Sequence, residues 1–288
     1  MVSRRKIVQV FTALITNLNL RGFWTGTIYR GVLKNICVPG LNCYSCPGAL
    51  GSCPIGSLQA VIGSIRYQMS YYVVGLLALF GGLAGRYICG WLCPFGLIQE
   101  LLYKIPTAKL RWNKKNSFLR FVKYGILVIF VILLPAFVVD FTGLGAPAFC
   151  KYICPAGTLE AGVPLILTNP QLQAVAGVLF NWKLFLLIIT IIMSVIIFRP
   201  FCYVVCPLGA IYAFFNKISL YQIKVDKQSC TSCQACARVC KMNVYIAKNP
   251  TSAECIRCGD CVADCPVKAL SSGIKAVKHD QEQSLKRS

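Results

Sequence analysis

The chain has few of the residues on which most enzyme active sites depend. Histidine occurs once in 288 residues, as His279 near the C-terminus, and Asp and Glu together number nine. One histidine provides no ligand pair for a membrane haem, and no C-x-x-C-H sequence is present to attach one, so we expect no haem. Ser-His-Asp and Cys-His catalysis lack their histidine, and no GxxxxGK[ST] loop supports ATP-driven chemistry.

The shortage of acidic residues leaves a formal net charge of +21, because Lys and Arg together number 30. A nucleic-acid-binding protein would gather such charges in a basic stripe on a soluble fold. Here they flank long apolar runs in a chain that is 56% hydrophobic, as the loops of a membrane protein do. We therefore expect the partners to include membrane lipid and no nucleic acid.

Four apolar segments predict about four membrane-spanning helices: residues 7–20, 67–85, 124–139 and 184–198. For residues 7–20, which are short and interrupted by Asn17 and Asn19, a helix on the membrane surface remains the alternative. The loop over residues 86–123 carries eight basic residues, and the chain after Arg199 is also basic. The positive-inside rule places both of these regions, with the N-terminus, in the cytoplasm. Residues 21–66 and 140–182 are then expected outside.

Cysteine, in contrast, is abundant, with 18 in the chain. Four cysteines begin a Cys-Pro-x-Gly sequence: Cys53, Cys93, Cys154 and Cys206. Proline suits the first position of a helix, so each of these cysteines is predicted to be an N-cap, where the helix dipole lowers the pKa of the thiol. Three of them have a second cysteine four residues earlier: Cys89, Cys150 and Cys202.

The order of these motifs predicts a parallel internal repeat within the membrane part. The repeat brings four cysteines together at the cytoplasmic end, in what we call the inner site: Cys89, Cys93, Cys202 and Cys206. On the opposite face it predicts an outer site of Cys46, Cys53, Cys150 and Cys154, with Cys37 and Cys43 as alternative ligands. We interpret both as metal or cluster sites, while disulfides remain an alternative for the outer cysteines.

Eight further cysteines form two copies of C-x2-C-x2-C-x3-C, over residues 230–240 and 255–265. This double run resembles that of bacterial two-cluster ferredoxins, in which the fourth cysteine of each run binds the other cluster. The resemblance implies one [4Fe-4S] cluster on Cys230, Cys233, Cys236 and Cys265, and a second on Cys255, Cys258, Cys261 and Cys240. Lys241 stands where the family usually has proline, and zinc is the alternative metal, although the spacing is unusual for it.

The apolar segments, the C-x3-C-P sequences at 89–94 and 202–207, and the ferredoxin run together resemble the polyferredoxin-like membrane proteins of the NapH/NosR type. The resemblance implies a multi-pass prokaryotic plasma-membrane protein of anaerobic respiration, with one or two further iron–sulfur clusters in its membrane part. It also implies an electron-transfer subunit rather than a stand-alone enzyme. The expected architecture is an α-helical polytopic membrane domain over 1–218, a small α+β ferredoxin-like cytoplasmic domain over 219–275 and a polar tail over 276–288.

Two functions remain open from the sequence. In the first, electrons pass between a cytoplasmic redox partner and a quinone or an extracytoplasmic redox protein, through ferredoxin and membrane clusters. In the second, Cys43 and Cys46 cycle as a C-x-x-C thiol–disulfide or metal-handling pair, which needs outer cysteines free of a cluster. No catalytic residue is expected, and Glu100, Asp140 and Glu160 are predicted to be exposed loop acids.

Overall fold

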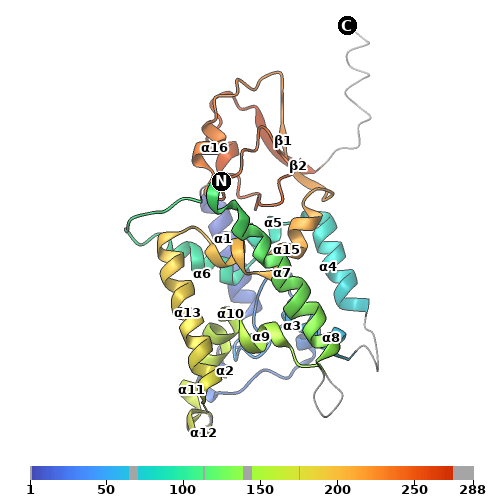
Figure 1. The fold of residues 1–288 in the computed structure, drawn as a ribbon, viewed down its shortest axis with the longest axis vertical. Coiled ribbons are helices and arrows are strands. Elements are labelled where there is room, and N and C mark those ends of the chain that lie inside the picture. The colour runs from blue at the N-terminus through green and yellow to red at the C-terminus, as the bar shows by residue number, and fades with distance from the viewer. Residues whose placement is uncertain (1, 65–70, 113, 139–144, 175, 275–288) are drawn as a thin grey trace.

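The computed structural model describes the chain except residues 1, 65–70, 113, 139–144, 175 and 275–288. Asp140 and the predicted polar tail, with His279, lie outside the described residues. Most of the described chain is helical, which confirms the helical part of the predicted fold class. Figure 1 shows an elongated body of helices, with a small sheet and α16 (Ala235–Val239) at one end of its long axis.

The helical body consists mostly of short helices. Its first half contains α1 (Val2–Thr16), α2 (Arg21–Thr25), η1 (Val32–Asn35), α3 (Pro54–Gly63), α4 (Tyr71–Ala84), α5 (Tyr87–Trp91) and α6 (Pro94–Leu102). Its second half contains η2 (Lys114–Phe121), α7 (Val122–Ile126), η3 (Leu127–Leu133), α8 (Leu134–Phe137), α9 (Ala148–Tyr152), α10 (Pro155–Gly157), η4 (Thr158–Gly162), α11 (Val163–Thr168), α12 (Pro170–Ala174), α13 (Val178–Ile196), α14 (Pro200–Val204) and α15 (Pro207–Phe215).

Two helical stretches are long and apolar enough to cross a membrane, Phe118–Phe137 and Val178–Ile196. Only 17% and 11% of their most apolar windows are buried inside the protein, so most of their apolar side chains face outward. Both overlap predicted spans, 124–139 and 184–198. The other two predicted spans correspond to α1 and α4, which have 15 and 14 residues, and their crossing of the membrane stays a prediction.

Two prolines are accommodated inside continuous helices by wider turns. The helix through Phe118–Phe137 becomes π-helical over η3, directly before Pro135 in α8. Proline has no N–H to donate and its ring clashes with the carbonyl one turn earlier, and a π turn provides the extra room. The same order recurs where η4 precedes Pro164 in α11.

The C-terminal part, residues 219–274, forms a two-stranded sheet with two short helices, and we call it the ferredoxin part. β1 (Tyr221–Val225) pairs antiparallel with β2 (Leu270–Ile274). α16 and α17 (Asp260–Ala263) follow β1 and precede β2 in the sequence, and the two helices pack against each other. Ile223, Ile246 and Ile256 lie in the buried core of this part. The sheet agrees with the small α+β unit that the cysteine pattern predicts.

The positions of the short helices decide where the cysteines lie. Figure 1 shows α5, α6 and α15 at the end of the body next to the ferredoxin part, and α2, α11 and α12 at the opposite end. α3, α9 and α10 lie toward that opposite end. The motifs that the repeat assigns to the inner and outer sites therefore separate along the long axis of the molecule.

Candidate metal centres

Each Cys-Pro motif begins a helix, as predicted. The N-cap residues of α3, α6, α10 and α15 are Cys53, Cys93, Cys154 and Cys206, and proline follows each of them. In α15, the Gly209 N–H donates to the Cys206 sulfur at 3.4 Å. The prediction that the thiol pKa is lowered is wrong, because burial raises the pKa by more than the hydrogen bonds of the first turn lower it. Burial raises the pKa of Cys53 and of Cys93 to about 12.

The inner site lies where α5, α6, α14 and α15 meet. Its four cysteines are all buried and belong to the main core of the helical body: Cys89, Cys93, Cys202 and Cys206. Cys89, Cys93 and Cys206 are close enough to interact electrostatically with one another. Each of these three also interacts electrostatically with Cys202. Four buried thiols from two matching motifs are the donor set that a [4Fe-4S] cluster requires, so the residues fit this group. Ligation itself stays a prediction.

Two buried arginines link the two cysteine motifs of the inner site, because each one bonds the motif to which it does not belong. Arg86 lies three residues before Cys89, and Arg199 lies three residues before Cys202. The Arg86 guanidinium donates to the Cys202 carbonyl at 3.1 Å, and the Arg199 guanidinium donates to the Cys89 carbonyl. Each arginine therefore holds the first cysteine of the other motif. The shared spacing R-x2-C-x3-C-P-x-G was available in the sequence as a signal for this pair.

An ion pair network supports the arginine that holds Cys89. Glu100 in α6 lies 2.8 Å from both Arg199 and Arg5, and all three side chains are buried. The prediction that Glu100 is an exposed loop acid is therefore wrong. Burial alone would raise the pKa of Glu100, but the guanidiniums of Arg199 and Arg5 hold it below its usual value. The surplus positive charge favours thiolates and a negatively charged cluster beside it.

The outer site lies around an open cavity of about 750 Å³ between α3, α9 and α10. Four cysteines line its wall: Cys43, Cys53, Cys150 and Cys154. Glycine keeps the sulfur atoms uncovered, because a Cβ at Gly157 would lie 3.6 Å from the Cys43 sulfur and 3.9 Å from the Cys154 sulfur. The donor set again fits a four-cysteine cluster.

The remaining two outer cysteines have other partners. The Cys46 sulfur donates to the Asn17 side chain at 3.7 Å, and the Cys37 sulfur donates to the Ser57 hydroxyl at 3.4 Å. The geometry thus favours the alternative ligand, Cys43, over Cys46 in the outer set. Cys43 and Cys46 both fitted the spacing of the sequence, which carries no information about where each sulfur points.

Glu160 also departs from its prediction as an exposed loop acid. It lies six residues after Cys154 in η4, is partly buried, and accepts a hydrogen bond from the Cys43 backbone N–H at 2.6 Å. Burial raises the pKa of Glu160 to about 7, although the Cys43 hydrogen bond opposes this rise. Its position fixes the segment that carries Cys43 beside the cavity.

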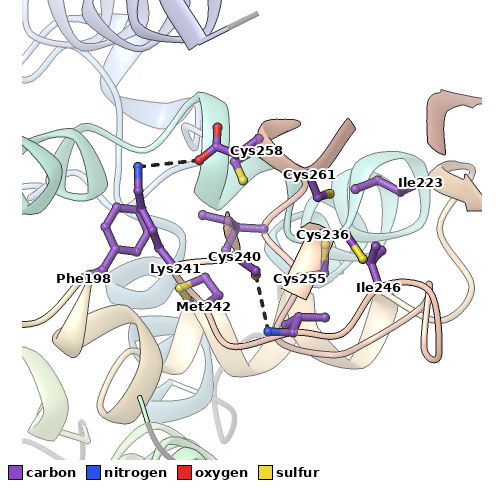
Figure 2. Close-up of a pocket in the computed structure, with 13 residues that line it drawn as sticks. Phe198, Ile223, Cys236, Cys240, Lys241, Met242, Ile246, Cys255, Cys258 and Cys261 are labelled. Carbon is purple, nitrogen blue, oxygen red and sulfur yellow. Dashed lines mark hydrogen bonds and ion pairs between the residues drawn. The ribbon is translucent and has the colours of Figure 1, made fainter. Parts of the chain in front are cut away.

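Two further cavities lie in the ferredoxin part. Figure 2 shows the first, whose wall contains Cys236, Cys240, Cys255, Cys258 and Cys261. The second is lined by Cys230, Cys233, Cys236 and Cys265. Each wall contains one of the four-cysteine sets that the ferredoxin resemblance implies, with the fourth cysteine exchanged between runs.

The chain around Cys240 is ordered by two polar contacts that Figure 2 marks. The Val244 N–H donates to the Cys240 sulfur at 3.3 Å, and Lys241 lies 3.7 Å from the Asp260 carboxylate. Lys241, which stands where proline is usual, therefore forms an ion pair with the buried Asp260, and Cys240 lies in the cavity wall.

The loop that carries Cys255 and Cys258 is packed directly onto α5 of the inner site. A Cβ at Gly90 would lie 2.2 Å from the Ile256 carbonyl oxygen, so only glycine permits this approach. The Trp91 indole donates to the Arg257 carbonyl at 3.0 Å. Glu254 accepts from Arg86 at 2.5 Å and from Lys123 at 2.6 Å. Arg86 therefore touches both the ferredoxin loop and the carbonyl of an inner cysteine.

Within the described ranges, no three Cys, His, Asp or Glu side chains converge closely enough to bind one metal ion. A [4Fe-4S] cluster has four irons, and each is bound by its own thiolate. Its ligands surround the cluster and need not meet at a single point.

Comparison with known proteins also indicates binding of 4Fe-4S clusters. The 4Fe-4S binding domain family matches residues 68–113, 126–164 and 180–227, stretches that contain the three C-x3-C-P sequences. An uncharacterised protein of Methanocaldococcus jannaschii is 31% identical over 224 residues, which are 74% of this chain and 81% of that protein.

Two relatives with functional names extend the comparison. The methylamine utilization ferredoxin-type protein MauN of Methylorubrum extorquens is 26% identical over 191 residues, which are 66% of this chain and 55% of that protein. The ferredoxin-type protein NapH of Escherichia coli is 23% identical over 224 residues, which are 74% of this chain and 71% of that protein. No solved structure matches the chain. The chain belongs to the 4Fe-4S binding domain family, and the ferredoxin-type proteins NapH and MauN are among its relatives.

Proposed function

We propose that the chain is an iron–sulfur electron conduit of a prokaryotic plasma membrane. Electrons pass between a cytoplasmic redox partner and an acceptor or donor on the outer side, and the chain acts as an electron-transfer subunit. The clusters supply one-electron redox chemistry when bound. The residues of the chain hold them at fixed positions, exclude water and adjust their potentials.

The contact between the ferredoxin loop and α5 carries this proposal. The backbone of Ile256, between Cys255 and Cys258, lies against Gly90, which is the next residue after Cys89. A ferredoxin cluster and an inner cluster held by these cysteines are thus neighbours across one backbone contact. A ferredoxin domain on a flexible tether would not need a glycine at the contact with α5, whereas a fixed domain does.

Four ligand sets follow from the four groups of cysteines. In the ferredoxin part they are Cys230, Cys233, Cys236 and Cys265 for one cluster, and Cys240, Cys255, Cys258 and Cys261 for the second. In the membrane part they are Cys89, Cys93, Cys202 and Cys206 for the inner cluster, and Cys43, Cys53, Cys150 and Cys154 for the outer cluster. The cavity walls and the buried inner core support this division.

The outer cavity supports a partner at that end of the conduit. Its volume of about 750 Å³ lies within the range of roughly 300–1,000 Å³ that small-molecule sites occupy. A quinone, or a side chain of an extracytoplasmic redox protein, would reach the outer cysteines through it. Cys43 and Cys46 have different partners for their sulfur atoms, so their placement gives the thiol–disulfide alternative no comparable support.

Iron analysis of the whole chain tests the proposal. The protein is purified anaerobically in detergent, and iron, labile sulfide and EPR signals are measured during a redox titration. We expect about sixteen irons per chain, in four clusters of four. About eight irons, with Cys53 and Cys154 open to alkylation, would restrict the clusters to the ferredoxin part and contradict a conduit across the membrane.

A further inference from the structure

In two of the four Cys-Pro motifs, the side chain six residues after the cysteine contacts a sulfur of a proposed metal centre. In the four motifs this position holds Gln59, Gln99, Glu160 and Tyr212. The two glutamines belong to the first outer and the first inner motif, and both are buried, at 0% and 1% exposure. A buried amide needs hydrogen-bond partners, so the atoms it meets show what it does.

Both glutamines donate a hydrogen bond to a cysteine of the partner motif. The Gln59 side-chain nitrogen lies 3.2 Å from the Cys150 sulfur in the outer site. The Gln99 side-chain nitrogen lies 3.1 Å from the Cys202 sulfur in the inner site. In each site the recipient is the first cysteine of the C-x3-C-P sequence, so the two contacts are equivalent.

The orientation of Gln59 is set at both ends of its amide. Its oxygen accepts from the Phe149 backbone N–H at 2.9 Å, and its NH2 group donates to the Cys150 sulfur and, also at 3.2 Å, to the Ile55 carbonyl. Phe149 is the residue before Cys150, so the Gln59 side chain bonds both the backbone next to Cys150 and the Cys150 sulfur. For Gln99, the nitrogen donates to Cys202 and, at 3.4 Å, to the Phe95 carbonyl, and the buried amide oxygen has no hydrogen-bond partner among the described residues.

A hydrogen bond to a cluster ligand has a defined electrical effect. Each reduction adds one electron to the cluster and breaks no bond, and part of the added negative charge resides on the ligand sulfurs. An N–H directed at such a sulfur stabilises the reduced state more than the oxidised state, because hydrogen bonds to the sulfurs set cluster potentials.

We propose that Gln59 and Gln99 are matched positioning residues that orient Cys150 and Cys202 and raise the reduction potentials of the outer and the inner cluster, respectively. This inference rests on the proposed ligand sets. It assigns each membrane cluster a separate control, because the two amides contact different sites. The equivalent positions in the other two motifs are Glu160 and Tyr212, and neither has a hydrogen bond to sulfur in the described structure. Glu160 accepts from a backbone N–H at 2.6 Å, and the Tyr212 hydroxyl donates to a backbone carbonyl at 2.9 Å.

The test compares Gln59→Met with Gln99→Met in the full chain. Methionine has a similar length and no N–H, so packing is largely retained while the hydrogen bond is lost. Potentials are measured by EPR-monitored redox titration of anaerobically purified protein with its iron content determined. The signals are assigned beforehand, since Cys154→Ser and Cys206→Ser each alter one membrane cluster.

We expect each methionine variant to lower one potential and leave the other three unchanged. A tenfold shift toward the oxidised cluster corresponds to about 59 mV for one electron, and this is the expected order of the change. The two variants serve as controls for each other. Unchanged potentials in clusters that are present, or an equal shift in all clusters, would overturn the inference.

Loss of one cluster is handled by a second variant. Gln59→Leu and Gln99→Leu also remove the NH2 group, and they introduce no titratable group at these buried positions. The potential should then fall as in the methionine variant, and a rise or no change contradicts the inference. If unaltered protein has only about eight irons, it is the proposed function that fails, and the titration separates this result from a failure of the glutamine assignment.

Discussion

Cys43 and Cys46 lie three residues apart, yet their sulfur atoms have different surroundings. Cys43 faces the outer cavity near Cys154, whereas Cys46 is only 2% exposed and bonds Asn17. The difference arises from tertiary contacts, above all the Glu160 carboxylate that holds the backbone of Cys43. The packing around this segment therefore places the Cys43 thiol, and not the Cys46 thiol, in the wall of the outer cavity.

Serine substitutions distinguish these two cysteines. We expect Cys43→Ser to remove or alter the outer cluster and to lower the iron content by up to about four per chain, since a hydroxyl is a poor replacement for a thiolate ligand. Cys46→Ser, which keeps a donor for Asn17, should retain the iron content and every EPR signal. Equal losses in both variants would contradict Cys43 as the fourth ligand.

At the scale of elements, α5 and the Cys255–Cys258 loop are joined by a close backbone contact. Gly90 faces the Ile256 carbonyl, and Gln9 of α1 donates to the Gly90 carbonyl from another side at 2.9 Å. The short helix is thus held between the N-terminal helix and the ferredoxin part. Its own five residues give no indication of either neighbour.

Adding a methyl group at this joint should separate the two elements. In Gly90→Ala the new Cβ would lie 2.2 Å from the Ile256 carbonyl oxygen, so backbone must move, at a cost of about 1–3 kcal/mol. We expect a lower Tm and slower reduction of the inner cluster by stopped-flow spectroscopy. The control is Gly75→Ala in α4, where a Cβ meets nothing within 4 Å. Identical reduction rates in both variants would contradict the joint.

At the scale of the whole molecule, Glu254 connects the ferredoxin part with the helical body. Its carboxylate lies 2.5 Å from Arg86 and 2.6 Å from Lys123, and both cations are wholly buried. Burial alone would raise the pKa of Glu254, but Arg86 and Lys123 hold it below its usual value. Two cations from the body therefore depend on one carboxylate from the other part.

Removing that charge should weaken the association of the two parts. In Glu254→Gln, Arg86 and Lys123 stay buried without a counter-charge, and loss of one partner of a buried pair costs about 3–5 kcal/mol. We expect a clearly lower Tm in detergent and faster proteolytic release of the ferredoxin part. Asp264→Asn, at an exposed acid, is the control and should leave both properties unchanged. Equal behaviour of the two variants would exclude Glu254 as the connection.

Features that depend on neighbouring residues could be predicted from the sequence. The Cys-Pro motifs begin helices because proline at the first helical position and a residue before it specify the start locally. The two-stranded ferredoxin part follows from its cysteine spacing in the same way. Two of the predicted spans have their counterparts in long apolar helices for a similar reason, since hydropathy is a local property.

Features that depend on distant partners could not be predicted. Glu100 is buried because Arg5 and Arg199 meet it from other segments, and counting charges along the loop does not show such pairing. The amide of Gln59 meets Cys150 across 91 positions of sequence. The thiol pKa values also reversed their expected direction, because the degree of burial is a property of the packed molecule.

The separation of the ion-pair partners along the chain has a consequence for biosynthesis. Arg5 meets Glu100 across 95 positions, and Arg86 meets Glu254 across 168. A ribosome releases these partners far apart in time, and contacts between distant segments form slowly even in a finished chain. Arg86 must therefore wait without its carboxylate until Glu254, in the last third of the chain, has been translated. Closure of the molecule is a late event, set by the emergence of the second run of cysteines.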